Sequence, residues 1–90
     1  MIKTIELQPI LNNQKSYYKK ANIRETKSGK TLISYSTKMA TIKDNKLIYL
    51  NKNIDVYTQT TLKHLKDFLY QELGINGLKK RDIIKMIDEL

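Results

Sequence analysis

An aromatic residue and two cations share one alternation in the stretch from Ser16 to Thr26, which is rich in strand-forming residues. Tyr18, Lys20 and Arg24 stand two or four positions apart there. Residues two apart in an extended strand point to the same face. Rings stack on unpaired bases while Lys and Arg neutralise phosphates, so this ladder predicts a face that binds nucleic acid. It equally suits a solvated strand face whose lysines discourage pairing between sheet edges.

Further cations extend this candidate surface. Lysines near an expected second hairpin would lie close to the ladder, and a basic run precedes Asp82 at the start of the last helix. A basic run opposes the positive end of a helix macrodipole, so such a placement indicates a phosphate contact. The full candidate set is Tyr18, Lys20, Arg24, Lys38, Lys43, Lys46, Lys79, Lys80 and Arg81.

The positive charge is concentrated in one part of the chain. Residues 1–53 carry eleven Lys or Arg against three acids, a balance of +8, whereas residues 54–90 carry six of each. The whole formal charge of +8 therefore belongs to the first part. A one-sided positive field attracts an anionic partner over long range.

Composition removes several kinds of catalytic and metal site. The 90 residues include no cysteine and one histidine, which excludes disulfides, thiolate metal sites and a zinc site built from several imidazoles. We predict His64 half-buried on the flank of a helix, with Asp67 as its one ionisable neighbour at helical spacing. Tyr35, Tyr49 and Tyr57 are expected at core edges with their hydroxyls toward solvent. We expect no enzyme, no metal and no cofactor.

The elements that must position these residues follow from periodicity and turn chemistry. Tight turns are indicated at residues 27–30, where Gly29 supplies a positive φ, and at residues 43–46. The strands expected around them are 2–7, 16–26, 31–35 with a possible continuation through 36–42 after a bend, and 47–50.

After a polar linker at residues 51–55 the period changes to that of a helix. Apolar residues recur every three or four positions from Leu62 to Leu73, with Thr58 as the expected N-cap and Gly74 as the C-cap. A second short amphipathic helix follows, ending near Leu90. The predicted fold is therefore α+β, an N-terminal antiparallel meander of three to five strands with two C-terminal helices packed on one face. The chain is expected to form a single domain, residues 1–90, with a basic β part (1–53) and a helical part (54–90).

The two helices suggest a helix-turn-helix reader, but two helices with balanced charge are a weak basis for that assignment. No apolar run is long enough to cross a membrane, and residues 1–8 lack the apolar stretch of a secretory signal. We expect a cytoplasmic protein.

Four strings carry a family resemblance: TIELQP at residues 4–9, QKSYY at 14–18, YST at 35–37 and YTQTTLKHLKDFL at 57–69. They resemble a family of small uncharacterised proteins common in phages, plasmids and integrated elements of low-GC bacteria. The most specific piece is Tyr-x-x-Thr-Thr-x-x-His, which ends at His64. Members often carry Gly at the position of Lys19, where this chain departs. The resemblance implies an accessory protein of a mobile element and no defined activity.

Three hypotheses remain open from the sequence. The first is a non-enzymatic accessory protein that binds nucleic acid through a basic sheet face. The second is a protein-binding inhibitor of a host defence nuclease, whose partner is a host or phage protein. The third is a small homodimeric scaffold, since short domains with exposed strand edges often pair.

Overall fold

The computed structural model describes residues 2–11, 17 and 19–90. It contains a single antiparallel sheet whose strands follow one another in sequence order, β1-β2-β3-β4-β5. A 3-10 turn and two helices come after the sheet. The elements are β1 (Lys3–Glu6), β2 (Ala21–Thr26), β3 (Gly29–Ser34), β4 (Thr37–Lys43), β5 (Lys46–Leu50), η1 (Ile54–Val56), α1 (Gln59–Leu73) and α2 (Lys80–Glu89). The predicted α+β meander with two C-terminal helices is confirmed.

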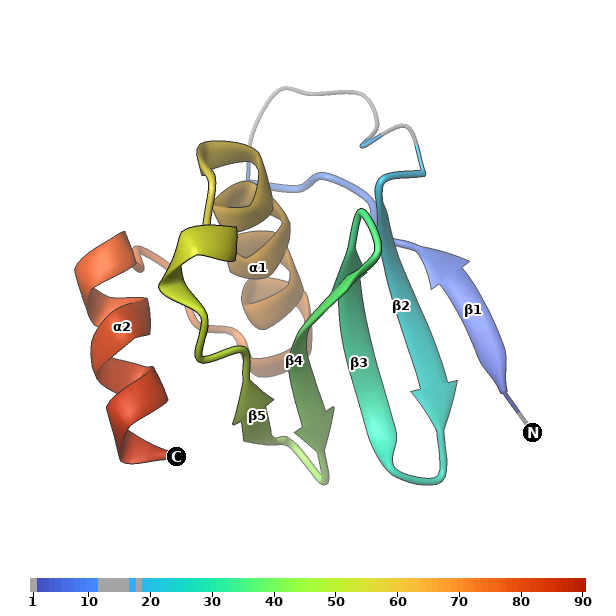
Figure 1. Cartoon of the computed structure of the whole chain (residues 1–90). Coiled ribbons are helices and arrows are strands. Elements are labelled where there is room, and N and C mark those ends of the chain that lie inside the picture. The colour runs from blue at the N-terminus through green and yellow to red at the C-terminus, as the bar shows by residue number, and fades with distance from the viewer. Residues whose placement is uncertain (1, 12–16, 18) are drawn as a thin grey trace.

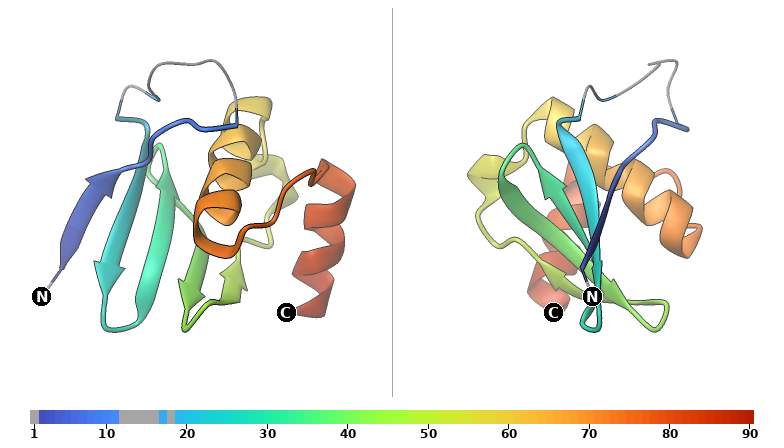
Figure 2. Two further views of the ribbon diagram at one scale, coloured as in Figure 1. Left: turned by 180° about the vertical axis from the view of Figure 1, so that it is seen from behind. Right: turned by 90° about the vertical axis from the view of Figure 1, so that its right-hand side faces the viewer.

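The helices cover one face of the sheet and leave the other open. Helix α1 lies behind the sheet in Figure 1 and in front of it when the molecule is turned by 180° (Figure 2). Helix α2 lies beside α1, beyond the β5 edge. We call the side turned toward the viewer in Figure 1 the uncovered face.

The core lies between the covered face of the sheet and the helices. Leu32 and Ala40 on the sheet and Leu65, Phe68 and Leu69 on α1 are fully buried. Positions along β2 alternate as the sequence predicts: Ala21 and Ile23 are buried, whereas Arg24, which follows Ile23, is exposed. This alternation fixes which side chains reach the uncovered face.

Two hairpins have the predicted turns. Gly29 follows the β2–β3 turn with φ 111°, and a Cβ atom at this position would overlap the carbonyl oxygen of Ile42 on β4. Asp44 and Asn45 form the β4–β5 turn with φ of 53° and 62°. Two positive φ angles in a two-residue loop match the twist of paired strands, and Asp and Asn tolerate them.

The possible continuation of the strand at residues 31–35 through residues 36–42 does not occur. The chain reverses at Tyr35 and Ser36, and β3 and β4 pair as antiparallel neighbours. Tyr35 has φ 58°, and its amide donates to the carbonyl of Lys20 at 2.6 Å. This contact with a distant residue holds a turn that lacks the usual Gly or Asn.

The first long strand begins later than predicted. Residue 20 is outside β2, because the amide of Lys20 donates to the carbonyl of Tyr17 at 2.9 Å and closes a turn. Lys19 within this turn has φ 64°, a left-handed conformation that glycine adopts without steric cost. The strand predicted over residues 16–26 is therefore shortened to Ala21–Thr26, and of the predicted ladder Arg24 lies within it whereas Lys20 does not.

Both helices have the predicted termini. The Thr58 hydroxyl accepts from the amide of Thr61 at 3.2 Å, and Gly74 ends α1 with φ 71°. At the start of α2, the amide of Lys79 donates to the carboxylate of Asp82 at 2.8 Å. This acidic partner offsets the basic run at the helix start. In the part of the chain that the structure describes, no helix is both long and apolar enough to cross a membrane.

Candidate nucleic-acid interface

One row of side chains crosses the uncovered face from β2 to β5. The register pairs Arg24 with Thr31, Thr31 with Thr41 and Thr41 with Tyr49. Directly paired residues share a face, so an exposed cation and a ring stand at the two ends of this row. The hydroxyls of Thr31 and Thr41 lie 2.9 Å apart between them, which ties the middle of the row together.

Lys38 occupies the neighbouring row, where it pairs with Ile33. Its ammonium lies over the ring of Tyr49, with Nζ 4.5 Å from the ring centroid. This cation–π contact places Lys38, the second cation of the uncovered face after Arg24, against the ring of Tyr49.

A groove of about 650 Å³ lies over β2, β3 and the start of β4. Arg24 and Lys38 line it, with hydroxyls from Ser28 and Ser36 at the two turns. Ile33 adds an apolar, partly exposed side chain to its surface. The groove thus combines cations, hydroxyl donors and a small apolar surface, which are the groups that contact phosphates, sugars and bases.

Lys20 lies at the upper end of the sheet, outside the strand ladder. Its ammonium is 5.7 Å from the ring centroid of Tyr35, a residue that also lines the groove. Lys20 therefore lies beside the groove through its contact with the turn at Tyr35, and it is not a member of the β2 ladder that includes Arg24.

The other predicted contacts are more scattered. Lys43 and Lys46 face each other across the β4–β5 hairpin, at the same end of the sheet as the β2–β3 turn (Figure 1). The basic run from Lys79 to Arg81 lies at the start of α2, beyond the β5 edge, and is not part of the uncovered face. Tyr18 lies outside the described residues.

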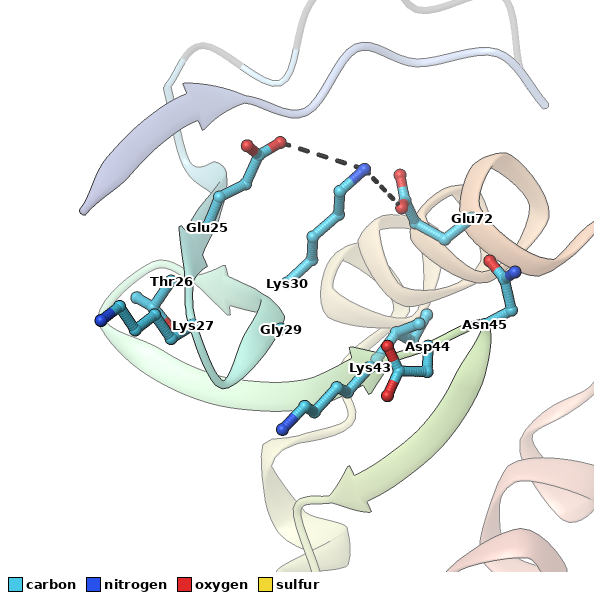
Figure 3. Close-up of a pocket in the computed structure, with 10 residues that line it drawn as sticks. Glu25, Thr26, Lys27, Gly29, Lys30, Lys43, Asp44, Asn45 and Glu72 are labelled. Atoms are coloured by element: carbon cyan, nitrogen blue, oxygen red, sulfur yellow. Dashed lines mark ion pairs between the residues drawn. The ribbon is translucent and has the colours of Figure 1, made fainter. Parts of the chain in front are cut away.

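Two carboxylates offset the charge of Lys30, so this residue does not add to the positive surface. Its ammonium lies 2.9 Å from Glu72 of α1 and 3.9 Å from Glu25 of β2 (Figure 3). The hydrogen bond with Glu72, together with both negative charges, raises the pKa of Lys30, and partial burial opposes this shift. These are the ion pairs within residues 2–11, 17 and 19–90. They border a cavity of about 370 Å³ at the foot of the sheet, and they join the helix to the strands.

A polar cluster is buried between α1 and the sheet. His64 Nδ1 lies 2.8 Å from the hydroxyl of Ser34, and that hydroxyl lies 3.1 Å from the hydroxyl of Thr61. Burial lowers the pKa of His64; the charge of Asp67 opposes this effect and that of Lys20 adds to it. The prediction of a half-buried histidine is wrong, because His64 is 1% exposed.

A Ser–His pair at hydrogen-bond distance is also the arrangement of an activated nucleophile. Here Ser34 is 1% exposed, and the edge of the Tyr17 ring meets the His64 ring at a centroid distance of 4.4 Å. A substrate atom has no approach to the hydroxyl in this conformation. We therefore assign the cluster to the packing of α1 on the sheet.

Asp67 anchors the chain that leaves β1. One carboxylate oxygen accepts from the amides of Ile10 and Leu11 at 3.0 and 2.8 Å, and the other accepts the hydroxyl of Tyr17. The side chain is fully buried. A buried carboxylate is stable there because donors surround it. In the described part of the chain, no group of three His, Asp or Glu residues could hold a metal ion.

The three tyrosines expected at core edges have three different environments. Tyr35 is half exposed in a turn, and Tyr49 is on the uncovered face. Tyr57 is buried instead of reaching solvent; its hydroxyl donates to the carbonyl of Asn51 at 2.6 Å, and burial raises its pKa to about 12. Tyr49 is the residue of the candidate interface that sequence reasoning missed. Its alternation with Leu50 was visible, but the pairing with β4 was not.

Comparison with known proteins adds a family and no activity. Residues 5–85 match the model of a family described as "Family of unknown function (DUF8033)". No curated protein and no solved structure gives a significant match. The matched region includes the uncovered face, the groove and the buried cluster around His64. Because the match spans most of the chain, the protein belongs to this family of unknown function.

Proposed function

We propose that this protein is a non-enzymatic nucleic-acid binder and that the uncovered face of its sheet is the binding surface. The observation that carries the proposal is the pair Arg24 and Lys38. Both are exposed, both line one groove, and neither forms an ion pair within the described residues. Following the family resemblance, we propose that the protein serves a phage or another mobile element in the cytoplasm of its bacterial host.

The distribution of charge supports this proposal. Residues 1–53, which contain all five strands, carry a balance of +8, and among the cations in the described part of this segment Lys30 is offset by carboxylates. Unpaired cations on an exposed face attract a polyanion and release its condensed counterions when it binds. Hydroxyls beside the cations add hydrogen-bond donors for phosphate oxygens.

Fluorescence anisotropy with labelled single-stranded DNA, single-stranded RNA and duplex DNA at about 50 mM salt tests the function. We expect binding of at least one probe, with affinity that falls as salt rises. If about three phosphates are neutralised, the slope of log affinity against log salt is about −2 for a single strand. Absence of binding to every probe at low salt would show that the proposed function is wrong.

A matched pair of variants locates the surface. Arg24→Glu with Lys38→Glu reverses two charges in the groove, and Lys80→Glu with Arg81→Glu makes the same change in net charge at the start of α2. The groove variant should lose about tenfold or more in affinity, whereas the helix variant should stay within a few-fold of the original protein. Equal losses would mean that net charge alone, and not this face, governs binding. Circular dichroism checks that both variants fold.

A further inference from the structure

The most specific feature of the uncovered face is the contact between Lys38 and Tyr49. Resting on the proposed function, we propose that this face takes a single strand, with Tyr49 as the surface on which one base stacks and with Arg24 and Lys38 as phosphate contacts. Tyr49 thereby takes the role that sequence alternation gave to Tyr18.

The row geometry fits a single strand laid across the strands of the sheet. Arg24 and Tyr49 are three inter-strand steps apart, about 14 Å at the usual strand spacing. Thr41 between them is 5% exposed and is fixed by its hydroxyl contact with Thr31. A row with a ring at one end, a cation at the other and a fixed centre accommodates a few consecutive nucleotides.

The cation–π contact indicates an exchange on binding. In the free protein the ammonium of Lys38 occupies the region above the Tyr49 ring, 4.5 Å from its centroid. A base stacked on that ring takes the place of the ammonium, which then turns to the adjacent phosphate. Base stacking on an aromatic side chain is typically stronger than an exposed cation–π contact, so the exchange favours the complex.

The shape of the face argues against a duplex. Bases in a duplex are stacked on their neighbours, so their faces are not available to a tyrosine ring. The major groove of DNA, about 12 Å wide, admits a helix or a two-stranded ribbon, whereas five strands span about 19 Å. Both helices lie away from the uncovered face (Figures 1 and 2).

The test compares three probes of equal length: an oligothymidylate, the corresponding duplex and an abasic oligonucleotide that keeps the phosphates. We expect the single strand to bind more tightly than the other two. Tyr49→Leu should lower affinity for the single strand about fivefold or more and leave affinity for the abasic probe unchanged, because only stacking is lost. Tyr49→Phe keeps the ring and should retain single-strand affinity.

A second measurement uses the original protein and does not depend on how Tyr49 variants fold. The Lys38 side-chain protons near the ring experience its ring current, so their NMR shifts should move toward free-lysine values when oligothymidylate binds. The abasic probe should produce a smaller change. Tighter duplex binding, or equal losses of Tyr49→Leu on all probes, would overturn the stacking role while leaving nucleic-acid binding intact. Failure to bind any probe would instead overturn the proposed function on which this inference rests.

Discussion

His64 on α1 and Ser34 on β3 are thirty residues apart in sequence, and their side chains meet at 2.8 Å in the interior. Both are 1% exposed. Helix α1 is therefore joined to the sheet by a hydrogen bond in the interior. Protonation of His64 would place a positive charge there without the solvation that the charge has in water, so the stability of the fold depends on pH.

The first prediction concerns this linkage. The usual pKa of His64 is 6.5, and burial lowers it in the folded state, so the unfolded chain binds a proton more readily. The contribution to stability is complete above about pH 6.5 and is lost as the pH falls toward the lower folded pKa. The free energy of unfolding in urea should therefore be smaller at pH 5.5 than at pH 7.5. His64→Asn should show a shallower pH dependence; an identical slope would contradict this assignment.

The second prediction concerns Asp67. Asp67→Ala leaves the amides of Ile10 and Leu11 and the hydroxyl of Tyr17 without their acceptor. We expect a loss of about 3 kcal/mol in the free energy of unfolding, measured by urea denaturation. Tyr17→Phe removes one of these bonds and should cost about 1 kcal/mol.

An exposed acid on α2 provides the control for Asp67. Asp88→Ala removes the same charge from a solvated position and should change stability by less than about 0.5 kcal/mol. Similar effects of the two aspartate substitutions would show that charge, and not the buried contacts, is responsible.

The third prediction separates backbone conformation from close packing. Gly29 and Gly77 both have positive φ, but a Cβ on Gly29 would overlap the Ile42 carbonyl, whereas a Cβ on Gly77 would have nothing within 4 Å. Gly77→Ala should cost about 1 kcal/mol for the left-handed conformation alone. Gly29→Ala should cost at least about 2 kcal/mol, because β4 must also move. Equal losses of stability for the two variants in thermal or urea unfolding would show that β4 shifts away from the new Cβ without a loss of stability.

The fourth prediction concerns the turn before β2. Lys19 adopts φ 64°, so Lys19→Gly removes steric strain at some cost in the entropy of the unfolded chain. We expect a net gain of about 0.5 kcal/mol in stability. Lys20→Gly makes the same substitution where φ is not positive and should destabilise the protein. A melting temperature that falls for both variants would contradict this account.

Local signals predicted much of the fold. The Asp44–Asn45 turn, Gly29 and the Thr58 and Gly74 caps each depend on residues within a few positions of one another, and each was predicted correctly. The start of β2 was not, because the turn at Lys19 is held by contacts with residues far along the chain. Its amide reaches the carboxylate of Glu6, thirteen residues away.

The candidate site was less accessible to sequence reasoning. Arg24 was placed correctly on a solvent-facing row by alternation. Tyr49 was missed because its neighbours on that row come from β4 and β3. The register between two strands depends on both strands and cannot be inferred from the sequence of either one alone. His64 was judged by its position on a helix, but the sheet residue Ser34 decides its burial.

The meander order of the sheet has a consequence for synthesis of the chain. Because each strand pairs with the next one along the sequence, the strands can assemble progressively as they leave the ribosome, and from β2 to β5 two-residue loops join them. Leu32 and Ala40 stay without cover until α1 follows. A nascent chain that stalls after β5 would therefore expose the apolar face of its sheet to solvent, and we expect it to be prone to aggregation until residues 59–73 emerge.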